Sequence, residues 1–387
     1  MNPRLTRQEL LRRGAAGGAF LAFPSLLAAC GGGGGSEAGG GEVLDALNFS
    51  NWCCYIDTPT TRKDAGMTGP TTFEQFKDKT GITVNYYVDI DDNATYFAKV
   101  QGPLSQGQGI DRDIFVFTDN SRFPGLLVDQ GWVQKVDKSL IPNMSNLIAP
   151  QASPPFDPNR DYSLPWFSGI TGIAWNKKLT APVRTMEQFF TDPKLKGKIT
   201  MLQELADSVG LTMLGNGDDP TKVTPTNFDA AIATIKDAVD SGQIQKFLGN
   251  SYTLPLVKGD VAAAIAWSGD VTQLKTDNPD LEWAIPESGG MIWTDNMFIP
   301  TGGSVPTAST YMNSVYEPTI AVQIALAAGY ISSVQGIREE AEKIDPKAAS
   351  NPTIFPTPEM LSQVHQYDST ALNNDDYIKT WQGVLGQ

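Results

Sequence analysis

Short apolar runs alternate along the chain with amphipathic segments, beginning at Val43. The apolar runs predict strands at 43–49, 82–88, 113–117, 170–175, 198–202 and 261–267. The amphipathic segments predict helices at 71–80, 96–101, 185–190, 228–241 and 319–329. Repeated strand, helix, strand order is typical of α/β proteins, so we expect mainly parallel sheets.

The length of 387 residues fits two domains at roughly 100 to 200 residues each. With 41% hydrophobic and 19% charged residues, the composition is that of a globular protein that can bury a proper core. The cleft between two such domains is the default position for a ligand site.

Residues 1–29 have the layout of a secretory signal. Arg12 and Arg13 precede the apolar run 14–29, which is short for a membrane span of roughly 20 residues. The run ends in Leu-Ala-Ala before Cys30, as in bacterial lipoprotein signals, where the cysteine is lipidated. The paired arginines leave both twin-arginine and general secretory export open.

Residues 30–42 begin with Cys30 and are rich in glycine, which is typical of a flexible tether between a lipid anchor and a folded body. We therefore expect an exported protein that is anchored to the outer face of the cytoplasmic membrane or lies in the periplasm.

The charge of the chain is acidic and unevenly placed. The 29 Lys and Arg residues and 43 Asp and Glu residues give a formal net charge of −14. Residues 1–29 contain four arginines and one glutamate, which leaves −17 on the remainder. Such a body repels phosphate backbones, so nucleic acid is not an expected partner.

The sequence offers little for metal or covalent chemistry. It has one histidine, His365, expected on a surface helix, and three cysteines without CxxC spacing. Motifs for phosphate loops, dinucleotide binding, zinc proteases and serine hydrolases are absent. We expect no catalytic residue, metal or cofactor. Cys53 and Cys54 could form a vicinal disulfide or remain two thiols, and thiols are slightly favoured because adjacent cysteines close a ring of poor geometry.

Aromatic residues stand beside acids at the ends of predicted strands. The clusters are Asn51-Trp-Cys-Cys-Tyr55, Glu204 with Asp207, Trp267-Ser-Gly-Asp270 and Trp293-Thr-Asp295. Trp293 and Asp295 share one face of an extended segment, and ligands of α/β sheets bind beyond strand ends. Tryptophan faces and carboxylates attract organic cations, with about 0.5 to 2 kcal/mol per cation–π contact. One alternative is that each aromatic residue only packs in the core. Another is that two of the acids form the acid pair of an exported hydrolase.

At these residues the chain resembles the spermidine/putrescine-binding receptors of bacterial ABC importers, over about residues 45–385. The more specific pieces are Asp161-Tyr-Ser-Leu-Pro165 and Trp267-Ser-Gly-Asp270. The resemblance implies a two-domain α/β fold of the type II periplasmic-binding-protein kind, with a hinge and an inter-domain cleft. It assigns 43–171 plus 294–337 to lobe 1, and 172–293 plus 338–387 to lobe 2.

The resemblance also implies a set of ligand-binding residues in the cleft. They are Trp52, Tyr55, Thr118, Glu204, Asp207, Ser251, Trp267, Asp270, Trp293, Asp295 and Tyr330. The tryptophans match aromatic walls around a polyamine, and the acids match groups that hold its amines. The chain departs from the family at Cys54, which replaces an acid, at Asn120, which replaces a tyrosine, and at 58–70, which looks like an insertion beside the site.

We therefore predict a monomeric, non-enzymatic receptor that binds a polyamine or related small organic cation and delivers it to an ABC permease in the membrane. A receptor of the same fold for another solute, such as an amino acid or opine derivative, is one alternative, and it would need a basic residue in the cleft. The hydrolase, with Glu204 and Asp207 or Asp270 and Asp295 as its acid pair, is the other.

Overall fold

The computed structural model describes residues 42–386, so the predicted signal, Cys30 and nearly all of the Gly-rich tether lie outside the described residues. The strands are β1 (Ala46–Trp52), β2 (Thr83–Ile90), β3 (Ile114–Thr118), β4 (Val133–Gln134), β5 (Ser163–Asn176), β6 (Ile199–Leu202), β7 (Ile244–Leu248), β8 (Ala263–Trp267), β9 (Leu281–Ala284), β10 (Gly290–Pro300), β11 (Ile331–Ser332) and β12 (Val364–His365). The α-helices are α2 (Pro59–Asp64), α3 (Thr72–Thr80), α4 (Asn93–Ser105), α5 (Phe123–Asp129), α6 (Met186–Thr191), α7 (Leu205–Gly215), α8 (Pro225–Asp240), α9 (Thr253–Lys258), α10 (Ser268–Leu274), α11 (Val305–Val315), α12 (Pro318–Ala328), α13 (Ile337–Ile344), α14 (Pro358–Leu361) and α15 (Asp375–Leu385).

A mixed sheet runs through the molecule in the order β2-β1-β3-β10-β5-β8-β6-β7. β1 pairs in parallel with β2 and β3, and β6 pairs in parallel with β7 and β8. The two halves meet at β5 and β10, which pair antiparallel with each other and with β8 and β3. The prediction of mainly parallel sheets is therefore wrong at the centre, because these two long strands carry the chain from one half to the other and back.

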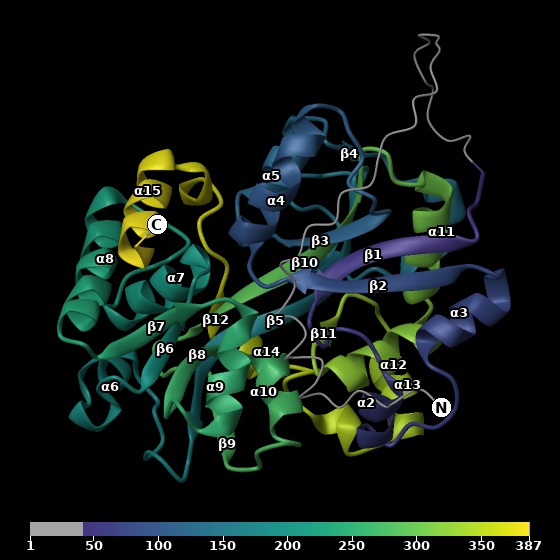
Figure 1. Cartoon of the computed structure of the whole chain (residues 1–387). Coiled ribbons are helices and arrows are strands. Elements are labelled where there is room, and N and C mark those ends of the chain that lie inside the picture. Colours follow the sequence, from purple (N-terminus) through teal and green to yellow (C-terminus); the bar gives the residue numbers. More distant parts are fainter. Residues whose placement is uncertain (1–41, 387) are drawn as a thin grey trace, which may run out of the picture.

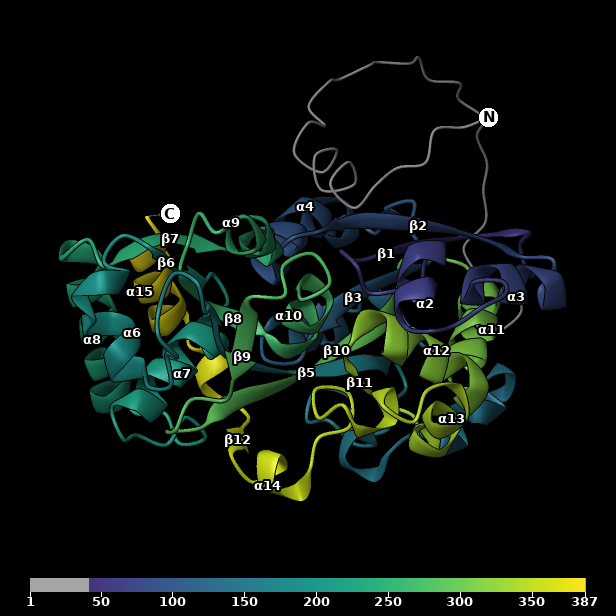
Figure 2. The ribbon, with the colours of Figure 1, turned by 90° about the horizontal axis from the view of Figure 1, so that it is seen from below.

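The two halves of the sheet form two lobes (Figure 1). Helices α3, α4, α11 and α12 surround β1 to β3, whereas α6 to α8 and α15 surround β6 to β8. The view from below shows β5 and β10 running between the lobes (Figure 2). The predicted boundaries, 171/172 and 293/294, fall inside β5 and β10, and α13 packs against α12 while α15 packs against α8. The assignment of segments to lobes stays a prediction.

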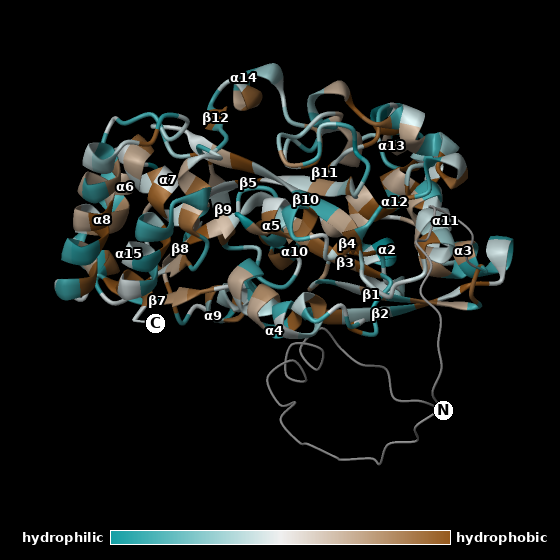
Figure 3. Ribbon diagram, turned by 90° about the horizontal axis from the view of Figure 1, so that it is seen from above, coloured by the Kyte–Doolittle hydropathy of each residue, from teal (hydrophilic) through white to brown (hydrophobic). Residues whose placement is uncertain are grey.

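The local sequence explains where helices begin and end. Thr71 and Glu74 form a capping box at the start of α3, and Gly81 ends this helix with a φ of 80°. Gly329 ends α12 in the same left-handed conformation, as its position after an apolar helix predicts. Figure 3 shows hydrophilic and hydrophobic positions around α8, the amphipathic pattern that the sequence predicts for this segment.

His365 lies in the short strand β12, and not on a helix as expected. It pairs with Met291 at the start of β10, where the backbone hydrogen bonds of a sheet edge override the local preference of the segment. None of the helices in residues 42–386 is long and apolar enough to cross a bilayer.

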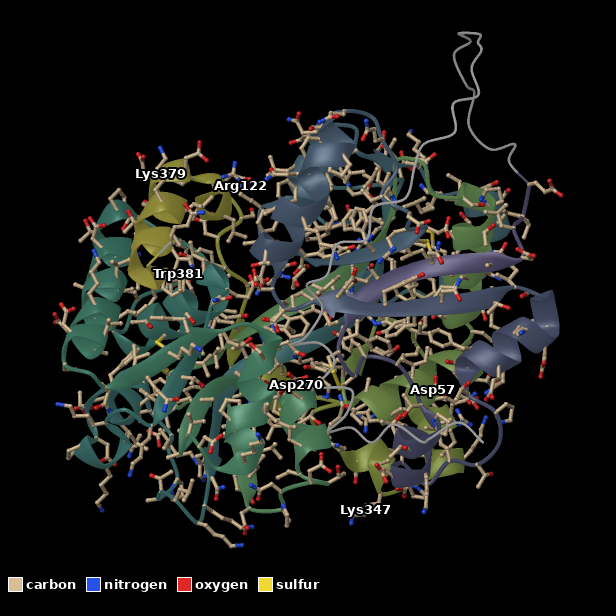
Figure 4. All side chains as sticks on the ribbon, viewed as in Figure 1. Asp57, Arg122, Asp270, Lys347, Lys379 and Trp381 are labelled. Carbon is tan, nitrogen blue, oxygen red and sulfur yellow. A yellow bond between two sulfur atoms is a disulfide. The ribbon has the colours of Figure 1, made fainter. Side chains whose placement is uncertain are left out.

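The C-terminal helix α15 is tied to both lobes. Its Trp381 donates a hydrogen bond from Nε1 to the backbone oxygen of Gln203 at 2.7 Å, next to β6. Arg122 Nη1, at the start of α5, lies 2.7 Å from Asp375 Oδ1 of α15. Figure 4 shows Arg122 beside α15 near the top of the molecule. Because this ion pair is largely exposed, it contributes little stability by itself.

A buried ion pair fixes the segment 58–70, which contains α2. Arg62 Nη1 lies 2.8 Å from Asp57 Oδ2, and the two side chains are 5% and 0% exposed. Arg62 Nη1 also donates to Gln323 of α12 at 2.7 Å, and Asp57 accepts from the backbone N–H of Thr72 at 2.9 Å. The pair therefore anchors α2 between α12 and the start of α3.

We expect Arg62→Met to lower the free energy of unfolding by about 3 kcal/mol, because it leaves the Asp57 carboxylate buried without its partner. Urea unfolding measures the change. Lys63→Met is the matched control, because the neighbouring Lys63 is exposed, and we expect it to change the same quantity by less than about 0.5 kcal/mol. Equal effects of the two substitutions would contradict the role given to the pair.

Candidate ligand-binding site

A cavity of about 20 Å³ lies where strands of both lobes end. Ten of the eleven residues predicted to bind ligand line it, namely Trp52, Tyr55, Thr118, Glu204, Asp207, Trp267, Asp270, Trp293, Asp295 and Tyr330. Cys53, Asn120 and Asn250 line it as well. A cavity of about this size holds little more than one water molecule, so the side chains of the two lobes nearly fill the space between them.

Strand register brings these side chains together. In β10, Asp295 lies opposite Thr118 at the end of β3, and Trp293 lies opposite Gly169 of β5. Because Trp293 and Asp295 are two residues apart in one strand, both point to the cavity, as the sequence predicts.

The aromatic residues form one continuous wall. The ring centroids of Trp52 and Trp267 are 5.8 Å apart, and those of Trp267 and Trp293 are 6.0 Å apart, both in edge-to-face geometry. Tyr330 extends the wall, with its ring centroid 5.8 Å from that of Trp293. The wall presents ring faces and edges to the same space as the acids.

Two glycines allow this wall to lie against the backbone. A Cβ atom at Gly169 would overlap the Trp293 ring, and one at Gly269 would overlap the Tyr330 ring. Any side chain at either position would therefore displace an aromatic residue of the wall.

Asp270, at the start of α10, accepts three hydrogen bonds from neutral side chains. The hydroxyls of Tyr330 and Tyr252 donate at 2.8 and 3.0 Å, and Asn250 Nδ2 donates at 2.9 Å. Figure 4 shows Asp270 near the middle of the molecule. The carboxylate is thus held in place without a basic partner.

Asp207, in α7, also accepts three hydrogen bonds from neutral groups. The donors are Thr171 Oγ1 at 2.7 Å, Trp267 Nε1 at 3.1 Å and Asn120 Nδ2 at 3.2 Å. Thr171 also accepts from Trp293 Nε1 at 2.9 Å, so it links the acid to the aromatic wall. Sequence reasoning missed Thr171, because it stands inside an apolar strand and carries no local signal.

Glu204 and Asp295 have fewer donors. Glu204 Oε1 accepts from the backbone N–H and from Nδ2 of Asn93, at 2.9 and 3.0 Å, at the start of α4. Asp295 Oδ1 accepts from Thr118 Oγ1 at 2.7 Å. Asn93 Nδ2 also lies 3.0 Å from Thr118 Oγ1, so one amide joins the two acids through a neutral chain. Asn93, like Thr171, was missed.

Burial raises the pKa of all four carboxyl groups, because the cavity removes water from their charged forms. The pKa is about 6 for Asp207 and Asp270, about 7 for Asp295 and about 8 for Glu204. Hydrogen bonds to each of the four acids favour the charged form and limit the rise, and negative neighbours add to the rise for Asp295 and Glu204. No Lys, Arg or His of residues 42–386 lines the cavity.

Ser251 lies outside the cavity, although the resemblance places it among the ligand-binding residues. Its backbone N–H and Oγ donate to the Asp91 carboxylate at 2.9 and 3.3 Å, at an exposed position. The preceding residue, Asn250, faces the cavity instead. The contact with Asp91 joins the loop after β2 to the segment after β7.

A disulfide joins Cys53 and Cys54, so the slightly favoured state, two free thiols, is wrong in this structure, and the alternative of a vicinal disulfide is the one found. Cys54 has a φ of 62°, so the turn after β1 brings the two side chains together. Cys53 lines the cavity, while Cys54 is exposed. The backbone oxygen of Cys54 accepts a hydrogen bond at 3.1 Å from Gln273 of α10.

Two α/β lobes joined by crossing strands, with a cleft of acids and aromatic residues, define a solute receptor of the type II periplasmic binding class. The chain belongs to the bacterial extracellular solute-binding protein family, whose model matches residues 71–383. It is similar to the spermidine/putrescine-binding periplasmic protein of Escherichia coli (strain K12), with 25% identity over 319 residues that cover 82% of this chain and 85% of the relative.

Solved structures confirm the predicted two-lobed fold. PotD, the spermidine/putrescine ABC transporter substrate-binding protein of Streptococcus pneumoniae, matches with a TM-score of 0.69 and 21% identity, covering 88% of this chain and 98% of that chain. The PBP AgtB from A. tumefaciens R10, in complex with agropinic acid, matches with a TM-score of 0.68 and 17% identity, covering 89% of this chain and 100% of that chain.

We expect the buried acids to make the protein, measured without added cations, less stable as the pH rises from about 5 to about 8. A carboxyl whose pKa is higher in the folded than in the unfolded state adds stability at low pH, and this contribution disappears as the pH rises through the folded-state value. Glu204→Gln removes the group with the highest of the four pKa values and keeps an oxygen for Asn93. Its free energy of unfolding should fall less over this range than that of the wild type.

Urea unfolding at pH 5, 6, 7 and 8 measures this difference. Glu339→Gln is the control, because Glu339 is exposed on α13, and it should follow the wild type. Parallel pH dependence of Glu204→Gln and the wild type would contradict the raised pKa of Glu204.

Proposed function

We propose that this protein is an extracytoplasmic receptor that holds a polyamine, or a related small organic dication, between its lobes and delivers it to an ABC permease. One observation carries the proposal: four buried carboxyl groups line a cavity to which residues 42–386 contribute no basic side chain. A buried carboxylate without a counter-charge is costly, and ammonium groups of a ligand would supply that charge.

The number of acids favours a ligand with more than one positive charge. Glu204 and Asp295 have the fewest hydrogen-bond donors and the highest pKa values, so they gain most from ammonium groups. The tryptophan wall lies along the same cavity and suits the methylene groups between the charges. Within the described residues, no group of three or more His, Cys, Asp or Glu side chains is placed to hold a metal ion.

The comparisons support a polyamine over an acidic solute. The relative from E. coli is named for spermidine and putrescine, and it aligns over most of both chains. An acid such as the agropinic acid of AgtB would require a basic group, and none of the described residues that line the cavity is Lys, Arg or His. The cavity chemistry therefore disfavours the alternative of an amino acid or opine receptor.

Export and anchoring form part of the proposal. Cys30 would carry the lipid, and the Gly-rich tether would leave the folded body free to reach the permease as a monomer. Closure of lobes 1 and 2 about β5 and β10 would trap the cation and give the permease a signal of occupancy. No step of this role requires catalysis.

We expect calorimetry at moderate salt to show binding of putrescine, cadaverine, agmatine or spermidine with a Kd below about 100 μM, or about −5.5 kcal/mol. For the amine that binds most tightly, Asp295→Asn and Trp267→Ala should each raise the Kd by about tenfold or more. Asp295→Asn removes a counter-charge, and Trp267→Ala removes an aromatic contact. Ser369→Ala is the matched control, and its affinity should stay unchanged because Ser369 is exposed and does not line the cavity. The absence of binding by all four amines would refute the proposal.

We also expect the affinity for the dication to fall as the pH is lowered from about 8 to about 5.5, because protonated Glu204 and Asp295 no longer attract an ammonium group. Binding near pH 7 should release protons, which calorimetry detects by comparing buffers with different ionisation enthalpies. Affinity that is independent of pH, without proton release, would contradict the assignment of these two acids as the receiving groups.

A further inference from the structure

A groove of about 810 Å³ opens beside the candidate binding cavity. It shares three lining residues with the cavity, Cys53, Asn250 and Asp270. Asp270 is 6% exposed and borders both spaces, so the groove continues the cavity past this carboxylate.

The two walls of the groove come from different lobes. One wall contains the disulfide Cys53–Cys54, α2 and the end of β2, and the other contains α9 and α10. The hydrogen bond from Gln273 Nε2 to the backbone oxygen of Cys54 joins the walls at 3.1 Å. The groove is therefore shaped by the same closure that encloses the cavity.

The lining of the groove is mainly apolar. Ile56, Val88 and Leu274 line it together with the disulfide, and Val88 is 40% exposed although it is apolar. Three acids, Asp64, Asp270 and Asp277, also line it together with one base, Lys63, whereas the cavity has acids and no base. This chemistry suits an apolar group better than a further ammonium.

One wall of the groove is held in place by contacts within the fold. Cys54 and the segment 58–70 both contribute lining residues. The buried ion pair of Asp57 and Arg62 holds α2 in position, so the position of this wall is fixed by the folded structure. A groove with a wall fixed in this way points to a ligand with a part that extends beyond the acid-lined cavity.

We propose that the receptor takes a polyamine that carries an apolar substituent on one terminal nitrogen. The unsubstituted ammonium would lie among the acids of the cavity, the substituted ammonium beside Asp270, and the apolar group in the groove against Val88 and Leu274. This inference rests on the proposed function and adds the class of substrate.

Calorimetry with putrescine, N-benzylputrescine and spermine tests the inference on the wild-type protein. We expect N-benzylputrescine to bind about tenfold or more tightly than putrescine, equivalent to about 1.4 kcal/mol. Spermine has a longer chain but no apolar end group, and should not share this gain.

Val88→Trp narrows the groove without touching the acids. We expect it to remove the advantage of N-benzylputrescine and to leave the affinity for putrescine within about twofold. Val239→Trp is the matched control, because Val239 is 37% exposed on α8 and does not line the groove, and it should change neither affinity. Thermal unfolding shows whether both variants are folded. If Val88→Trp does not fold, the comparison of N-benzylputrescine with putrescine on the wild-type protein decides the inference.

The outcomes separate the inference from the proposed function. Binding of putrescine without a gain for N-benzylputrescine overturns the inference and leaves the function standing. A gain for spermine alone overturns the apolar assignment, and a gain for N-benzylputrescine that survives Val88→Trp overturns the position in the groove. Failure of every amine to bind overturns the proposed function and the inference with it.

Discussion

The structure depends on one electrostatic constraint: four carboxyl groups share a cavity that has no basic partner among the described lining residues. Neutral donors hold each of them, and some of these donors cross between the lobes. Asn93 reaches Glu204, and Asn120 reaches Asp207. Some of the contacts between the lobes are therefore made to the same carboxyl groups that attract a cation, so closure of the lobes and the charge of the site are coupled.

The strands β5 and β10, which run from one lobe to the other, place the side chains of the site. Both strands pass through the centre. The register of β10 with β5 sets Trp293 opposite Gly169, and its register with β3 sets Asp295 opposite Thr118. Thr171 then links Asp207 to the aromatic wall. A change in the relative position of the lobes must bend these two strands, and so it must also move Trp293 and Asp295, which β10 carries.

Local pattern predicts much of this arrangement, because strand ends meet at one edge of a sheet and alternate residues of a strand share a face. It could not predict the antiparallel crossing, which depends on pairing between distant segments. For the same reason Thr171 and Asn93 were missed, His365 joined a strand, and the cavity residue after β7 is Asn250 and not Ser251. The pairing of Cys53 with Cys54 depends on a left-handed turn that neighbouring residues do not signal.

The two close-packed glycines give the site unequal scope for evolutionary change. Gly169 and Gly269 press the backbone against Trp293 and Tyr330, so even the smallest new side chain there disrupts the aromatic wall. The side of the site from Cys53 to Asp64 contains exposed positions. Substitutions between Cys53 and Asp64 can therefore change which ligands fit during evolution, while the aromatic wall behind the two glycines keeps its shape.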